Sequence, residues 1–131
     1  MSNITIGFLA FLLVTVALLL AVIITGKKGL RKLHLTLVVT TLVSLGITIY
    51  FAEQLGTLYD LDAAGWMKPF HLTLAKICVL AYLAPIITGI ITFRGNHKMR
   101  RLHARLAYAV FGLTVLTLIT GTAMILMAER L

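Results

Sequence analysis

The chain is poor in the residues that build soluble catalytic sites. Of its 131 residues only four are acidic, and its one cysteine, Cys78, excludes an intramolecular disulfide. All four acids lie at or beyond the ends of apolar runs, so no run contains a carboxylate to couple protons, as a small four-helix drug exporter would need. The sequence also has no nucleophile–base–acid set, no phosphate-binding loop and no closed zinc site. If the protein is an enzyme, its chemistry is therefore redox chemistry.

Apolar residues are in excess instead. They make up 60% of the chain, and four long apolar runs occupy 4–25, 33–52, 71–93 and 103–128. About 20 helical residues cross the hydrocarbon core of a membrane. The runs lack the alternation of barrel strands, so they predict helices. The first run has no cationic start and no cleavage site, so it predicts a retained helix. The sequence predicts one all-α membrane domain over 1–131, an up-down-up-down four-helix bundle.

The basic residues gather in two connections. Nine of the twelve Lys and Arg residues lie in 26–32 and 94–105, and the acids lie on the other side of the predicted spans. The positive-inside rule then predicts cytoplasmic basic loops and both termini on the outer, periplasmic or extracellular, side of a bacterial inner membrane. The plain interpretation of the basic clusters is orientation of the chain and contact with anionic membrane lipids. Nucleic acid is not an expected partner, because no groove-reading element accompanies the charges.

Histidines open three of the four predicted helices. LRKLH at 30–34 matches MRRLH at 99–103, and HLTL occurs at 34–37 and 71–74. The three residues are His34, His71 and His103. Each histidine is followed five helical turns later, on the same face of its helix, by a small residue: Ala52, Gly89 and Gly121 respectively. IITG at 23–26 and 86–89, with LITG at 118–121, adds to the likeness between the helices.

This pattern predicts a haem site. In the predicted topology His34 and His103 lie at one depth on parallel helices, with Gly89 beside them leaving room for a flat group. Two imidazoles are suitable axial ligands for haem b iron in an electron-transfer centre, and bundle cores hold such cofactors. Four cations just outside the histidines would hold the propionates: Arg31, Lys32, Arg100 and Arg101.

Two other interpretations of these histidines stay open. Copper is a less favoured cofactor, because it normally needs a third or fourth ligand and His97, in a polar loop, is the only spare one on that side. His97 is more simply a solvated loop residue. The histidines could also be anchors at the membrane interface. An ionisable group within a membrane span nevertheless indicates function by default.

His71 is expected near the outer surface, level with Gly121. No second histidine lies on that side, so a second haem there would be five-coordinate or ligated by Met67, Met124 or Met127, or it would be absent. A quinone or a partner protein could use His71 instead.

Three other residues of the third run have plainer interpretations. Lys76 is expected to extend back to the interface or to hold an anionic group. Cys78 is expected in the core, and Pro85 is expected to kink the third helix.

The chain resembles the YozB/CtaM-type family of small bacterial four-helix membrane proteins of unknown function. The resemblance rests on RKLHLTL (31–37), HLTLA (71–75), KMRRLH (98–103) and ITG (119–121), and covers about residues 30 to 128. The family's link to cytochrome oxidase maturation implies handling of haem or copper. A looser resemblance to cytochrome b-561 proteins implies haems on histidines of paired helices. Carried over residue by residue, the resemblance involves His34, His71 and His103.

Three functions follow from these observations. The first is a haem b membrane protein that transfers electrons, with quinone or a partner complex as exchange partner. The second is a haem or copper delivery factor for a terminal oxidase. The third is a non-catalytic accessory subunit of a respiratory or photosynthetic complex, or a homo-oligomer, whose histidines only lie at the interface.

Overall fold

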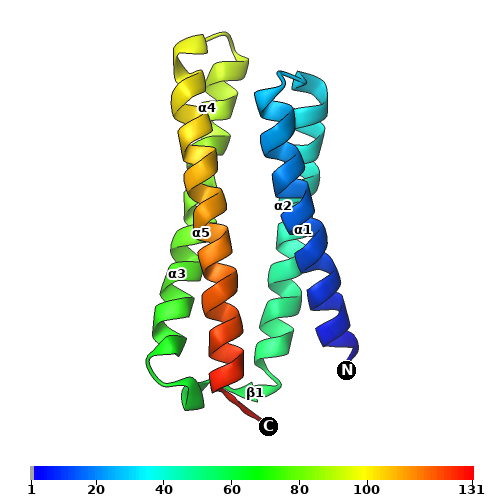
Figure 1. Cartoon of the computed structure of the whole chain (residues 1–131), viewed down its shortest axis with the longest axis vertical. Coiled ribbons are helices and arrows are strands. Elements are labelled where there is room, and N and C mark those ends of the chain that lie inside the picture. Colours follow the sequence, from blue (N-terminus) through cyan, green and yellow to red (C-terminus); the bar gives the residue numbers. More distant parts are fainter. Residues whose placement is uncertain (1) are drawn as a thin grey trace. The chain divides into compact units, whose positions relative to one another are not determined.

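The computed structural model describes residues 2–131, and it divides the chain into two compact units (Figure 1). The first unit runs to Asp60 and also includes Arg130 and Leu131; the second runs from Leu61 to Glu129. The first contains α1 (Asn3–Lys27), α2 (Arg31–Gly56) and β1 (Tyr59–Asp60). The second contains η1 (Leu61–Ala64), α3 (Met67–Ala81), α4 (Leu83–Phe93), η2 (His97–Met99) and α5 (Arg100–Met127). A short strand, β2 (Glu129–Arg130), ends the chain.

The first unit is a hairpin of α1 and α2, which pack along each other. Ser2 caps α1, because its Oγ accepts from the backbone N–H of Thr5 at 3.2 Å. Gly29 makes the turn between the helices with φ of 69°, a left-handed conformation that glycine adopts without steric cost. At the other end β1 pairs with β2, and the backbone N–H of Leu131 donates to the carbonyl of Leu58.

The second unit packs α3 and α4 against α5. The predicted third helix is broken at Tyr82, between α3 and α4. Pro85 explains the break, because it has no N–H to donate to the carbonyl of Ala81 and its ring clashes with that carbonyl. The predicted kink at Pro85 is therefore confirmed as an interruption one turn before the proline.

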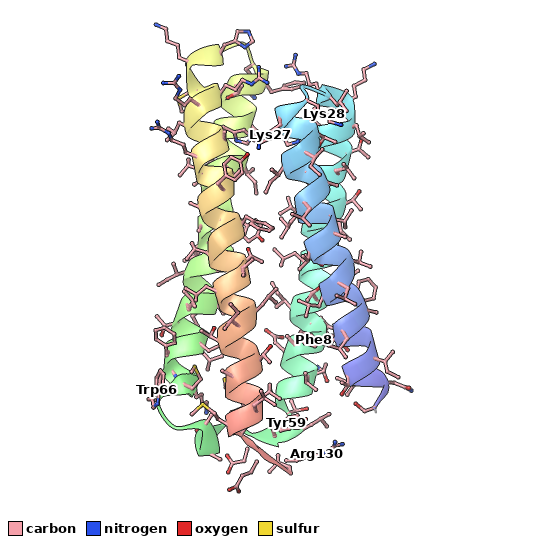
Figure 2. The ribbon with its side chains drawn as sticks, in the orientation of Figure 1. Phe8, Lys27, Lys28, Tyr59, Trp66 and Arg130 are labelled. Atoms are coloured by element: carbon pink, nitrogen blue, oxygen red, sulfur yellow. The ribbon has the colours of Figure 1, made fainter. Side chains whose placement is uncertain are left out.

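Within residues 2–131, four segments are long and apolar enough to cross a membrane, which confirms the prediction of a helical chain with four candidate spans. They are Asn3–Lys27, Arg31–Gly56, Met67–Phe93 and His97–Met127. Each begins before its predicted apolar run, and the first two also end after it. Figure 2 shows Lys27 and Lys28 at the loop end of the first hairpin, and Phe8 and Tyr59 toward its other end.

Hydroxyl groups occupy the interior of each hairpin. In the first unit the Oγ1 of Thr15 lies 2.7 Å from Ser44 Oγ and 2.9 Å from Thr48 Oγ1. In the second, the Tyr82 hydroxyl lies 2.7 Å from Thr114 Oγ1. Large apolar side chains such as Leu13 and Val39 are exposed instead. This distribution suits lipid, where helices associate through small residues and internal hydrogen bonds.

The basic loops are expected on the cytoplasmic side, and single cysteines test this. In a Cys78→Ser background, Thr57→Cys should react with a membrane-impermeant maleimide in intact cells, whereas Asn96→Cys should react only after lysis. Both positions are exposed, one after α2 and one in the basic loop after α4. The reverse labelling pattern would overturn the predicted orientation.

Candidate functional site: three histidines held between helices

Three of the chain's four histidines lie directly on a glycine of a neighbouring helix. A Cβ built on Gly26 would lie 3.1 Å from Cε1 of His34, and one on Gly89 would lie 3.0 Å from Cε1 of His103. For Gly121 the corresponding distance, to Cε1 of His71, is 2.9 Å. These distances are tighter than an ordinary van der Waals contact, so an alanine would displace each ring. Only a residue without a side chain therefore fits at these positions without moving the imidazole ring.

The residue before each glycine is a threonine that contacts the same imidazole. The distance from Oγ1 to Nδ1 is 3.3 Å for Thr25 and His34. It is 3.2 Å for Thr88 and His103, and 2.9 Å for Thr120 and His71. His34 Nδ1 also lies 2.9 Å from the carbonyl oxygen of Val22. We call each of these arrangements a His–Thr–Gly contact: His34–Thr25–Gly26, His103–Thr88–Gly89 and His71–Thr120–Gly121.

The chain path brings each histidine to its Thr–Gly pair. In the first unit Thr25 and Gly26 lie in the last turn of α1, and His34 lies in the first turn of α2, just after the basic loop. In the second unit Thr88 and Gly89 are near the end of α4, and His103 is in the first turn of α5. The third contact is at the opposite end of the second unit, between the start of α3 and the end of α5. Every contact therefore lies within one hairpin.

The threonines of these contacts are more buried than the histidines. Thr25, Thr88 and Thr120 are almost fully buried, at 6%, 7% and 6% exposure. The three histidines are half-buried. The imidazoles are thus anchored from the interior of the hairpin through Nδ1, with part of each ring reaching its surface.

The structure confirms the interpretation of Cys78 and locates the other predicted site residues. Cys78 is buried, with its Sγ 3.6 Å from Thr114 Oγ1. His97 is exposed in η2, and Lys76 is exposed on α3. The four cations expected at the propionates are exposed in the first turns of two helices: Arg31 and Lys32 in α2, Arg100 and Arg101 in α5. Each pair thus begins the helix that carries His34 or His103.

The glycines have a different immediate neighbour from the one that the sequence suggested. Gly89 was expected to leave room for a flat group beside His34 and His103; its close neighbour is the imidazole of His103 itself. Gly121 was expected to lie level with His71, and the His71 ring lies against it. His34 and His103 belong to different units, so their sharing of one iron stays a prediction.

Sequence reasoning missed four residues of these contacts. They are Gly26 and the three threonines, Thr25, Thr88 and Thr120. The signal was present in the repeated ITG, which precedes a histidine-opened helix at 24–26 and 87–89 and recurs at 119–121. The role of this repeat could not be predicted from the sequence, because each Thr–Gly pair contacts a histidine of another helix.

The first unit has a related contact without a histidine. A Cβ on Gly7 would lie 2.7 Å from Cε1 of Phe51, so a phenyl ring covers this glycine. Gly7 is near the start of α1 and Phe51 near the end of α2, at the end of the hairpin away from the basic loop. An aromatic ring on a glycine is therefore a packing device in this fold. The imidazoles add a nitrogen that the phenyl ring lacks.

The described residues present single imidazoles rather than a cluster of metal-ligating side chains. Over residues 2–131 no group of three or more His, Cys, Asp or Glu side chains could hold a metal ion. A copper ion normally needs such a group. A haem brings four nitrogens of its own and takes only one or two axial ligands from the protein, for which a single anchored imidazole is sufficient.

Comparisons with known protein families, with curated proteins and with solved structures give no significant match to the chain. The resemblance to the YozB/CtaM-type family therefore stays a prediction.

Two glycines of α5 provide a matched test of these contacts. Gly121→Ala should destabilise the protein by about 1–3 kcal/mol, the usual cost of overpacking, because the new methyl group would meet the His71 ring. Gly112→Ala should be neutral or stabilising, since nothing lies within 4 Å of its Cβ position and alanine favours helix. Unfolding in mixed detergent micelles measures both. Equal effects would contradict the close contact.

Proposed function

We propose that the protein is a haem b-binding membrane protein that transfers electrons, with His34 and His103 as axial ligands and a second site at His71. The observation that carries the proposal is the repeated anchoring of a half-buried imidazole through Nδ1. Metal-ligating histidines in general hold one ring nitrogen in a hydrogen bond and ligate through the other. The same arrangement is built three times, each time with a buried threonine.

The charges near two of the histidines support the same proposal. Arg31 and Lys32 precede His34 within one helical turn, and Arg100 and Arg101 precede His103 in the same way. Haem carries two propionates, and hydrogen bonds between guanidinium and carboxylate are among the stronger polar contacts. We propose that these cations bind the propionates at the cytoplasmic side. At the His71 end the first turn of α3 contains one cation, Lys68, whose Nζ binds Asp62 at 2.6 Å.

In this proposal haem b supplies a one-electron couple. The chain supplies the axial ligands and the apolar surroundings. Electron exchange with a membrane quinone or with a respiratory or photosynthetic complex would then follow. Copper stays the less favoured cofactor. An assembly factor that hands haem to a terminal oxidase would use the same histidines.

A non-catalytic accessory subunit is the second candidate. The contact of Gly7 with Phe51 favours it, because there an aromatic ring covers a glycine in a position where no ligand nitrogen exists. If the histidines play the same part, they only join the helices of each hairpin.

Substitution by phenylalanine separates these two functions. His103→Phe should keep the packing on Gly89, as Phe51 does on Gly7, but remove the nitrogen. The purified wild-type protein should show a b-type band in its reduced-minus-oxidised spectrum and a positive pyridine haemochrome assay. His103→Phe should stay folded and lose at least half of the haem per chain, whereas His97→Phe, in the exposed turn η2, should keep it. A wild-type protein without the band, or a His103→Phe protein with full haem content, would refute the haem proposal and favour the accessory role.

A further inference from the structure

The three threonines each have a backbone carbonyl of their own helix within reach of their only hydroxyl hydrogen. Thr25 Oγ1 donates to the carbonyl of Ala21 at 2.8 Å. Thr88 Oγ1 donates to the carbonyl of Ala84 at 2.9 Å, and Thr120 Oγ1 to that of Thr117 at 3.1 Å. A hydroxyl group has one hydrogen and two acceptor lone pairs. When that hydrogen goes to the carbonyl, the threonine oxygen can only accept from the imidazole.

In that arrangement Nδ1 of each histidine carries a hydrogen. At His34 a second contact leads to the same assignment, because the Val22 carbonyl 2.9 Å from Nδ1 can only accept. A neutral imidazole has one N–H and one lone pair, so an Nδ1–H leaves the lone pair on Nε2. This arrangement gives all three rings the same tautomer.

We propose that Thr88 and Thr120 are positioning residues that hold His103 and His71 in the Nδ1–H tautomer and so present Nε2 as the electron-pair donor. At His34 the Val22 carbonyl shares this role with Thr25. The proposed tautomer is argued from these contacts; only the iron as recipient of the lone pair rests on the proposed function. Such outer hydrogen bonds orient a ligating ring and raise its basicity, and their removal commonly costs about 10- to 100-fold in metal affinity.

The first experiment reads the tautomer directly, without haem. In the haem-free, full-length protein labelled with ¹⁵N-histidine in detergent micelles, protonated and unprotonated ring nitrogens have well-separated chemical shifts. In the wild type, the Nδ1 atoms of His34, His71 and His103 should be protonated and their Nε2 atoms unprotonated. A protonated Nε2 on neutral His71 in the wild type would overturn the proposal without any variant.

Variants of Thr120 and Thr25 test the role of the hydroxyl groups. Among the described residues, Thr120 provides the only hydrogen bond to the His71 ring. Thr120→Val should therefore release His71 into a mixture of tautomers, and Thr120→Ser should keep it in one. Thr25→Val is the matched control, because the Val22 carbonyl still accepts from His34. An unchanged His71 spectrum in Thr120→Val would contradict the positioning role.

Titration with haemin separates this inference from the proposed function. Compared with wild type, the variant with all three threonines changed to valine should bind haemin about tenfold more weakly. That loss is at the low end of the usual range because His34 keeps its carbonyl partner. The corresponding triple serine variant should bind like wild type. A wild type that binds no haemin would refute the haem function and leave the tautomer assignment intact. A triple valine variant that binds as tightly as wild type would refute the positioning role alone.

Discussion

The contact of an imidazole ring with a glycine of the neighbouring helix is the constraint on which both units depend. In lipid the hydrophobic effect does not drive helices together, so they associate through close approach and internal hydrogen bonds. Glycine permits the approach, and the threonine before it provides the hydrogen bond. Because two of these contacts lie beside the basic loops, they join the two helices of each hairpin where the chain turns. The third joins the start of α3 to the end of α5.

The sequence was sufficient to predict which segments are helices but not which residues contact one another. Apolar runs of about 20 residues and the chemistry of Pro85 determine the spans and the break at Tyr82. The spacing of eighteen residues between His71 and Gly89 describes one helix face. The observed contact of Gly89 is with His103 on the next helix, fourteen residues further along the chain. Such a pairing depends on the length of the loop and on the relative rotation of the two helices. The periodicity along one helix gives no information about either.

The interior polar groups relate the fold to the proposed chemistry. A buried hydroxyl group in a membrane helix can donate its hydrogen to a backbone carbonyl one turn earlier. Thr25 and Thr88 each have such a carbonyl within hydrogen-bonding distance. In the proposed arrangement that bond leaves the hydroxyl oxygen as an acceptor for an imidazole N–H. A local property of threonine in a helix would thereby determine which nitrogen of a histidine on another helix is the electron-pair donor. The phenyl ring of Phe51 on Gly7 has the same packing without this consequence.

The most direct test of this account is the proximity of each imidazole to its glycine in the haem-free protein. Nuclear Overhauser effects from the ring Hε1 protons of His34, His71 and His103 should reach the Hα protons of Gly26, Gly121 and Gly89, because each Cε1 lies 2.9–3.1 Å from the Cβ position of its glycine. His97, exposed in η2, should give none of these signals. Absence of the three effects in the folded protein, or their appearance between histidines and other residues, would contradict the His–Thr–Gly contacts and the site built on them.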